Sequence, residues 1–209
     1  MNKNLFIVFL FFGHLFFGQE SAKSAPKNKT QKDRYDYRAK IYGELIVPIA
    51  TGDNFVANGF DVNAGFVIRA ELLQPKLSYG LQYNRFEGRP NETALTGFID
   101  KTTFSHVVFY AKYHLLEQKD WFYLSPRAGI GSSTYTNSIG STRFFDSGFT
   151  VLVGLDTSFR VSDQISFNIG LSQIWDFLSI DTAQEIENDF NTTQFFVPSF
   201  GIQLHLIAR

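Results

Sequence analysis

The sequence contains no cysteine among its 209 residues. Disulfide bonds, thiolate metal sites, thiol nucleophiles and cysteine-linked lipids are therefore excluded. An excess of either charge is also missing, since 19 Lys and Arg stand against 20 Asp and Glu, which argues against a nucleic-acid-binding protein. No internal apolar run reaches the roughly 18 residues that a membrane-spanning helix needs, so a helical membrane protein is excluded as well.

Aromatic residues, by contrast, are abundant. The chain has 24 Phe and 9 Tyr, an aromatic share of 17%, whereas only 19% of its residues are charged. Typical soluble domains carry roughly 25% charged residues. A transmembrane β-barrel alternates apolar and polar residues along each strand, so this composition is compatible with one.

The first residues have the features of a secretory signal. Lys3 supplies a positive charge, residues 5–17 are almost wholly apolar, and Gly18 offers a small residue for cleavage. We predict a signal peptide over residues 1–18; the alternative is an N-terminal membrane anchor, for which the segment is short. Residues 19–38 are polar and mostly basic, which predicts a solvated, disordered periplasmic tail.

From residue 39 onward the apolar residues recur with a period of two. The clearest segment, residues 60–72, has seven consecutive apolar alternates, which predicts a strand because successive side chains point to opposite faces. Eight segments share this pattern, and they are residues 40–49, 60–72, 77–84, 106–115, 122–131, 149–161, 165–177 and 196–206.

The two faces of these segments differ sharply. The apolar faces hold no charged residue, and the opposite faces hold the charged side chains together with many Gly, Ser and Asn. The interior of an eight-stranded barrel only just accommodates its side chains, so eight faces rich in Phe and Tyr would overfill it. We therefore predict an inside-out barrel, in which the aromatic faces meet lipid and the small and polar faces line the lumen.

The predicted connections alternate in length. Those at 73–76, 117–120 and 162–164 are short, and those at 50–59, 87–101, 134–147 and 178–194 are long. Outer-membrane barrels have short periplasmic turns and long outer loops, with both termini in the periplasm. Aromatic residues near the strand ends are expected to form interfacial girdles, and they are Phe60, Tyr83, Trp121, Phe122, Phe159, Trp175 and Phe177.

A signal ending in Phe16-Phe17-Gly18-Gln19, followed by eight alternating segments, resembles the small outer-membrane β-barrel family of Gram-negative bacteria. That family includes OmpA/OmpX-like, porin-family and PorT-like proteins. The resemblance covers roughly residues 38–209 and rests on the pattern alone. It implies an all-β, eight-stranded antiparallel up-and-down transmembrane β-barrel over residues 39–209, located in the cell outer membrane.

The faces predicted to line the lumen carry charges of both signs. Unpaired buried charges are costly, so these side chains are expected to pair. We predict a lumenal charge network that plugs the pore; the alternative is a wet, weakly conducting pore lined by the same residues. The predicted members are Glu44, Arg69, Glu71, Lys112, Arg127, Asp156 and Arg160.

Catalysis has little support in the sequence. Some outer-membrane barrels cleave lipids with a Ser/His pair, and Ser105 and His106 are adjacent here, with His114 on the same strand. However, adjacent residues of a strand point to opposite faces, and such a pair cannot share a proton. We predict no catalytic residue and no cofactor.

The last long loop carries four carboxylates without the spacing of a calcium-binding loop. A solvated acidic loop is expected there, with a cation or partner site as the alternative, and the carboxylates are Asp181, Glu185, Glu187 and Asp189. No zinc spacing, phosphate-binding glycine loop or nucleotide fingerprint is found, so no metal is predicted.

These features predict a non-enzymatic outer-membrane barrel that serves as a membrane anchor, a structural protein or a surface-recognition protein through its long outer loops. The alternatives are a small-solute channel, a secretion- or assembly-associated barrel as the PorT-like resemblance permits, and a secreted soluble barrel with a lipid-like ligand. The expected partners are outer-membrane lipid, the barrel-insertion machinery and a surface or periplasmic protein, but no nucleic acid.

Overall fold

The computed structural model describes residues 37–73, 76–92, 96, 98–118, 121–179 and 190–207. These residues belong to one compact unit, Asp36–Arg209. The predicted signal peptide at 1–18 lies outside the described residues, as do the carboxylates of the predicted acidic loop and all but the last two positions of the tail at 19–38.

Eight long strands build the sheet. In chain order they are β1 (Tyr37–Ile46), β4 (Gly65–Leu72), β5 (Leu77–Pro90), β6 (Lys101–Tyr113), β8 (Phe122–Ile139), β9 (Thr142–Arg160), β10 (Ile165–Leu178) and β11 (Thr192–Ile207). Four shorter elements join their ends, and they are β2 (Ile49–Thr51), α2 (Phe55–Gly59), β3 (Phe60–Val62) and β7 (Leu116–Gln118).

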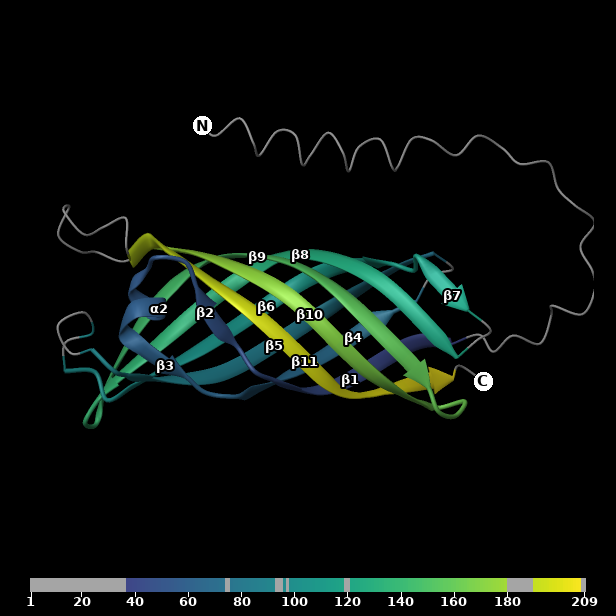
Figure 1. Ribbon diagram of the computed structural model, residues 1–209, viewed down its shortest axis with the longest axis horizontal. Helices are drawn as coiled ribbons and strands as arrows, with labels where there is room; N and C mark the ends of the chain where they lie inside the picture. The colour runs from purple at the N-terminus through teal and green to yellow at the C-terminus, as the bar shows by residue number, and fades with distance from the viewer. Residues whose placement is uncertain are drawn as a thin grey trace, which may run out of the picture. The chain divides into compact units, whose positions relative to one another are not determined.

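The sheet closes on itself. Each long strand pairs antiparallel with its neighbours in the chain, and β1 pairs with β11 (Figure 1). Glu44 of β1, for example, lies opposite Val67 of β4 on one side and Gly201 of β11 on the other. The predicted eight-stranded antiparallel up-and-down barrel is confirmed.

The barrel has two distinct ends. The start of β1 and the end of β11 lie at one end, which we call the terminal end. The turn between β8 and β9 lies at the other, which we call the hairpin end (Figure 1). No helix in the described part of the chain is long and apolar enough to span a membrane.

The apolar faces point outward. Phe66 is 40% exposed, Phe109 is 56% exposed and Val153 is 43% exposed on the outer wall. In contrast, Arg69 and Lys112 are 0% and 2% exposed. Because the large apolar side chains cover the outside and the charged ones fill the inside, the predicted inside-out orientation is confirmed.

The predicted strand over residues 60–72 is wrong in one respect, because it is interrupted between β3 and β4. Val62 of β3 pairs with Gly88, and Phe66 of β4 pairs with Arg85. Between these two pairs the chain from β3 to β4 advances four residues, whereas β5 advances three. The one-residue bulge reverses the alternation, since a shift of one residue turns a side chain to the other face. Phe60 is consequently buried in the interior, at 5% exposure, and does not belong to an outer girdle.

The predicted loop at 134–147 is wrong as well. β8 and β9 continue through it, with 18 and 19 residues, and meet in a tight turn at Gly140, whose φ is +57°. That left-handed conformation favours glycine. Because roughly 9–11 residues suffice to cross a bilayer, these two strands form a hairpin that extends beyond the crossing length at the hairpin end.

The connection at 50–59 folds into β2 and α2. Asn54 caps α2, and its side-chain oxygen accepts hydrogen bonds from the backbone N–H groups of Val56 and Ala57 at 3.1 and 3.0 Å. The cap satisfies N–H groups that a helix start leaves free. Val56 is fully buried against the interior cluster described below, so α2 contributes to the packing at the hairpin end (Figure 1).

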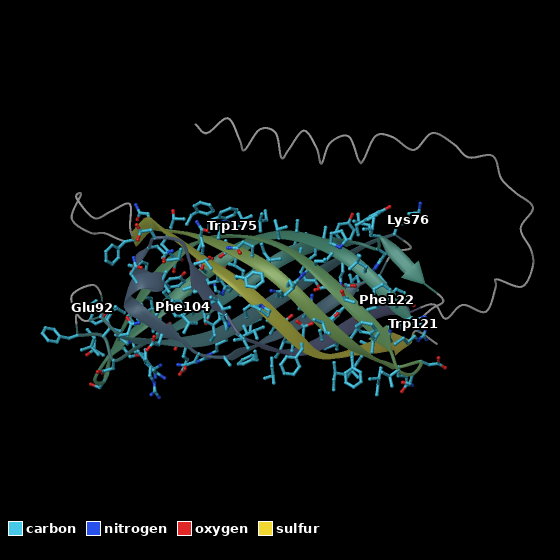
Figure 2. All side chains as sticks on the ribbon, viewed as in Figure 1. Lys76, Glu92, Phe104, Trp121, Phe122 and Trp175 are labelled. Carbon is cyan, nitrogen blue, oxygen red and sulfur yellow. The ribbon has the colours of Figure 1, made fainter. Side chains whose placement is uncertain are left out.

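Aromatic residues flank the barrel at both ends (Figure 2). At the terminal end the rings of Trp121 and Phe159 lie 6.2 Å apart. Phe122 belongs to β8, which pairs there with β7 on one side and with β9 on the other. At the hairpin end Phe149 and Phe177 lie 6.4 Å apart. In outer-membrane barrels, aromatic belts form at such positions near the strand ends.

Candidate functional site

Six of the seven predicted charged residues meet inside the barrel. Each lies on the inward-facing side of its strand and is at most 4% exposed. We call this set the ionic cluster, and its members are Glu44 on β1, Arg69 and Glu71 on β4, Lys112 on β6, Arg127 on β8 and Asp156 on β9.

Asp156 is the centre of the ionic cluster. Its Oδ2 lies 2.7 Å from Nη1 of Arg69 and 3.3 Å from Nζ of Lys112, and its Oδ1 lies 3.3 Å from Nε of Arg127. The guanidinium of Arg69 also binds the carboxylate of Glu44. Arg69 therefore joins β4 to both β1 and β9, which lie on different sides of the lumen.

Glu71 is a second carboxylate of the ionic cluster that binds several partners. Its Oε2 lies 2.6 Å from Nζ of Lys112 and accepts hydrogen bonds from the hydroxyls of Tyr42 at 3.2 Å and Tyr110 at 3.1 Å. The Lys112 ammonium donates to the Tyr42 hydroxyl at 2.7 Å. The sequence analysis did not identify these two tyrosines as members of the network. Both lie near charged residues on the inward face of their strands, and this position could have identified them.

The charges of the ionic cluster balance. Two arginines and one lysine face three carboxylates, all nearly withdrawn from solvent. Buried charges are tolerated when they are paired, and here the pairing is incomplete, since Oε2 of Glu44 and Nε of Arg69 have no hydrogen-bond partner among the described residues. Side chains outside the cluster contribute: Nη2 of Arg127 donates to Ser172 at 2.6 Å, and its Nη1 binds Gln82.

The seventh predicted member, Arg160, is placed differently. It lies at the end of β9, and its Nη2 is 3.3 Å from the Asp163 carboxylate in the β9–β10 turn. Its Nε also donates to the Ser162 carbonyl at 3.2 Å. Arg160 thus stands at the rim of the terminal end, whereas the ionic cluster lies deeper in the lumen.

A polar group centred on Asp176 lies nearer the hairpin end. One carboxylate oxygen of Asp176 is 2.7 Å from Nε2 of His106 and accepts a hydrogen bond of 2.7 Å from Tyr135. The other oxygen accepts from Thr150 at 2.6 Å. These contacts join β6, β8, β9 and β10 through the lumen.

An apolar plug fills the interior at the hairpin end. The rings of Phe104 and Tyr135 are 4.7 Å apart in an edge-to-face arrangement, and Phe86 stacks on Phe104 at 5.1 Å. Its buried members are Ile46, Val56, Phe60, Val67, Phe86, Phe104, Val108, Tyr135, Leu152, Ile174, Leu178, Phe195 and Val197. We call this set the aromatic plug.

Sequence reasoning missed the aromatic plug because it expected only small and polar residues in the lumen. Three aromatic residues of the plug lie two positions beyond the outermost inward-facing residue of a predicted strand, and they are Phe86, Phe104 and Phe195. Continuing the period of two past those strand ends would have found them. They were left out because the predicted strands stopped one or two residues short of them.

The Ser/His pair is separated, as expected from the alternation. His106 is fully buried and bound to Asp176, whereas Ser105 is half-buried on the opposite face. His114, after the end of β6, bonds instead to Ser78 at 2.7 Å and Ser125 at 3.2 Å. Within the described residues, no group of three His, Asp or Glu side chains could hold a metal ion.

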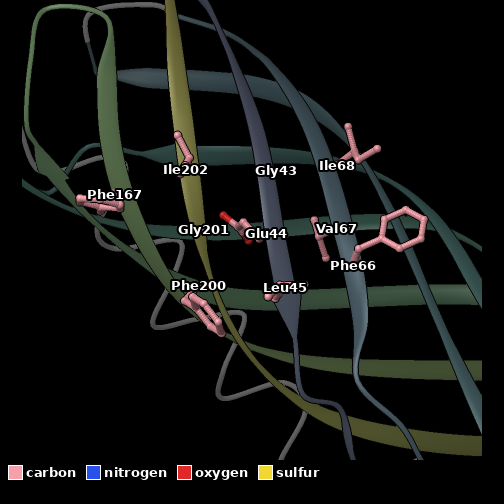
Figure 3. A pocket seen from close by; sticks show the side chains of 10 residues that line it. All are labelled: Gly43, Glu44, Leu45, Phe66, Val67, Ile68, Phe167, Phe200, Gly201 and Ile202. Atoms are coloured by element: carbon pink, nitrogen blue, oxygen red, sulfur yellow. The ribbon is translucent and has the colours of Figure 1, made fainter.

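The outer wall carries an apolar groove of about 520 Å³ over the seam between β1 and β11. Gly43 leaves it open, since nothing lies within 4 Å of where a Cβ would stand. Figure 3 shows the aromatic and aliphatic side chains around this gap. The groove offers shape and apolar contact without polar anchors.

Comparison with known proteins identifies the fold. No protein-family model and no curated protein matches the chain. Among solved structures, Neisserial surface protein A is similar, with a TM-score of 0.58 at 12% identity over 80% of this chain and 97% of that chain. The outer membrane protein OprG from Pseudomonas aeruginosa gives a TM-score of 0.53 at 11% identity over 83% and 98% of the two chains.

The N-terminal β-barrel domain of Pseudomonas aeruginosa OprF is also similar, with a TM-score of 0.50 at 9% identity over 83% of this chain and 100% of that one. At these identities the similarity concerns the fold. The predicted resemblance to small outer-membrane barrels is confirmed at that level.

Proposed function

We propose that the protein is a non-enzymatic integral barrel of the bacterial outer membrane, with a sealed lumen and a recognition surface at its hairpin end. Support for the location comes from the outward apolar wall, the aromatic belts and the similarity to outer-membrane barrels. A soluble barrel would instead expose large apolar patches to water.

The filled lumen is the observation that carries this proposal. The ionic cluster crosses the middle of the barrel through Arg69, which links Glu44 to Asp156. The aromatic plug then fills the hairpin end. Because the interior of an eight-stranded barrel only just holds its own side chains, we expect these two layers to leave no wide aqueous path among the described residues.

The hairpin end carries the features of a recognition surface. The β8–β9 hairpin extends beyond the crossing length, and Phe144 and Phe145 near its tip are 51% and 66% exposed. Phe98 in the neighbouring connection is 91% exposed. Exposed aromatic side chains on an extended hairpin are suited to contact with another protein or surface, since aromatics supply large contact areas at interfaces.

Planar-bilayer recording tests the sealed lumen. The purified barrel, with folding and insertion verified, should give no steady large conductance. Arg127→Ser removes a guanidinium that reaches three partners in the lumen and should raise the frequency of small openings. Arg143→Ser, on the exposed hairpin, is the matched control and should behave as the unaltered protein.

Steady large conductance from the unaltered barrel would overturn the proposal and favour a small-solute channel. The assembly-associated alternative is distinguished by reproducible co-purification of a periplasmic or secretion partner. Loss of that partner on shortening the β8–β9 hairpin would assign recognition to the hairpin end.

A further inference from the structure

Gly43 leaves a gap in the apolar outer wall. It lies on the outward side of β1, between Ile68 of β4 and Ile202 of β11 in the register, and both isoleucines line the apolar groove described above. The groove volume of about 520 Å³ falls within the range of about 300–1,000 Å³ that small-molecule sites occupy. The outward side chains that line it are aliphatic or aromatic, so an apolar chain is the chemistry that fits it.

Phe66 forms the side of the groove nearest β5. Its ring is directed away from Gly43 (Figure 3) and lies 6.1 Å from the ring of Tyr83. Arg85 of β5 lies directly opposite Phe66 in the β4–β5 ladder. Directly opposite residues of an antiparallel pair have Cα atoms about 4.5–5.5 Å apart. The side chain of Arg85 is therefore long enough to reach the edge of the groove.

Arg85 is an exposed cation at the point where the apolar wall of β5 ends. The outward residues of this strand change there from apolar or aromatic to charged, and in order they are Leu77, Tyr79, Leu81, Tyr83, Arg85, Glu87 and Arg89. Among the described residues no carboxylate lies within ion-pair distance of Arg85, and the nearby Glu87 is engaged by Lys101 at 3.1 Å. The cost of an arginine on the lipid face falls toward zero near the membrane interface. Arg85 can therefore stay charged there and accept a counter-ion from the membrane.

The cation and the groove are arranged in the order of the parts of a lipid. Tyr83 continues the row of Gly43 and Ile68, and Arg85 lies two residues farther along β5 toward the hairpin end. A chain in the groove thus lies deeper in the membrane than the guanidinium. Ser105 of β6 lies directly opposite Arg85 on its other side and carries a half-buried hydroxyl.

The chemistry of this headgroup position favours phosphate. A guanidinium binds phosphate oxygens through two parallel N–H donors. A serine hydroxyl can donate a further hydrogen bond to the same group. The groove provides apolar contact and the neighbouring strands provide the charge, so the complementary ligand has an apolar chain joined to an anionic head.

We propose that the outer wall binds one phosphate-bearing lipid of the membrane leaflet at the hairpin end, with an acyl chain in the groove over Gly43 and the phosphate on Arg85. Ser105 donates a hydrogen bond to the same phosphate. The site rests on the membrane location proposed above, because the groove must meet lipid. It does not involve the lumen, and therefore does not depend on whether the lumen conducts.

Native mass spectrometry of the full chain, folded in an uncharged maltoside detergent, tests the headgroup contact. The probe is dioleoyl phosphatidylglycerol, and dioleoylglycerol supplies the same chains without phosphate. We expect one saturable adduct with the phospholipid. Arg85→Met should weaken it roughly tenfold, as the loss of a charged hydrogen-bonded contact does, and should leave binding of dioleoylglycerol unchanged. Arg143→Met, which removes an exposed arginine of the β8–β9 hairpin, is the matched control and should bind as the unaltered protein.

Gly43→Phe tests the groove itself. Nothing lies within 4 Å of the Cβ position, so the ring can enter the gap without displacing a neighbour, and binding of both lipids should fall. Ala128→Phe, at an exposed outward position of β8, is the matched control for adding a ring to the wall. Equal phospholipid affinity in the unaltered protein and in either Arg85→Met or Gly43→Phe would overturn the proposal, as would the absence of a saturable adduct. A dimer that forms without added lipid and is lost in Gly43→Phe would assign the groove to a second copy of the chain and would overturn it as well.

Folding of each variant is verified by heat-modifiable gel mobility, and insertion is measured separately by flotation with vesicles. Loss of lipid selectivity with insertion intact overturns this site alone. Failure of the unaltered, folded protein to float with vesicles overturns the membrane location on which the site rests.

Discussion

Replacing Asp156 with Asn tests the account of the lumen most directly. The substitution keeps the size of the side chain and removes the negative charge that Arg69, Lys112 and Arg127 share. Three buried cations would then face two carboxylates. Breaking a buried ion pair by removing one partner costs about 3–5 kcal/mol, because the remaining charge stays buried without compensation. We expect the free energy of unfolding to fall by about that amount.

Urea unfolding in phospholipid vesicles, followed by tryptophan fluorescence, measures this loss. Asp163→Asn is the matched control, since its side chain is 62% exposed in the β9–β10 turn and its ion pair with Arg160 is screened by water. Exposed pairs contribute less than about 1 kcal/mol. Equal unfolding midpoints for the Asp156 and Asp163 variants would refute the view that a dry, paired charge cluster stabilises the barrel.

Three further predictions use the same unfolding assay. Phe109→Arg on the outer wall should cost about 2–4 kcal/mol in a bilayer, whereas Phe145→Arg at the hairpin tip should cost almost nothing; similar losses would argue against the membrane orientation. Phe104→Ala should cost about 3–5 kcal/mol, because it opens a cavity in the aromatic plug, and a loss under 1 kcal/mol would contradict tight packing there. Stability should fall as the pH drops from 6.5 toward 4, since the unfolded chain protonates His114 first; an unchanged slope in His114→Gln would contradict this.

The lumen combines two kinds of packing that differ in what they provide. The aromatic plug buries apolar surface at the hairpin end and excludes water by volume. The ionic cluster joins strands across the middle of the barrel, where Arg69 meets Glu44 and Asp156. We expect pairing of this kind to favour the native register of the strands at that level, since misplaced partners would leave buried charges unpaired.

The sequence by itself determined the strand faces of this protein. Alternation is a local property, because neighbouring side chains of a strand point in opposite directions wherever the strand lies. It was therefore sufficient to place Phe109 outside and Lys112 inside.

Only the tertiary structure decided which inward residues meet. Arg69 and Asp156 are 87 positions apart, and their contact depends on the register of every strand between them, which no local pattern contains. A single extra residue before β4 likewise turned Phe60 inward, because one step of register reverses the face of a side chain. Contacts across a barrel arise from the sum of all its strand pairings, whereas the alternation that predicts each strand depends on that strand alone.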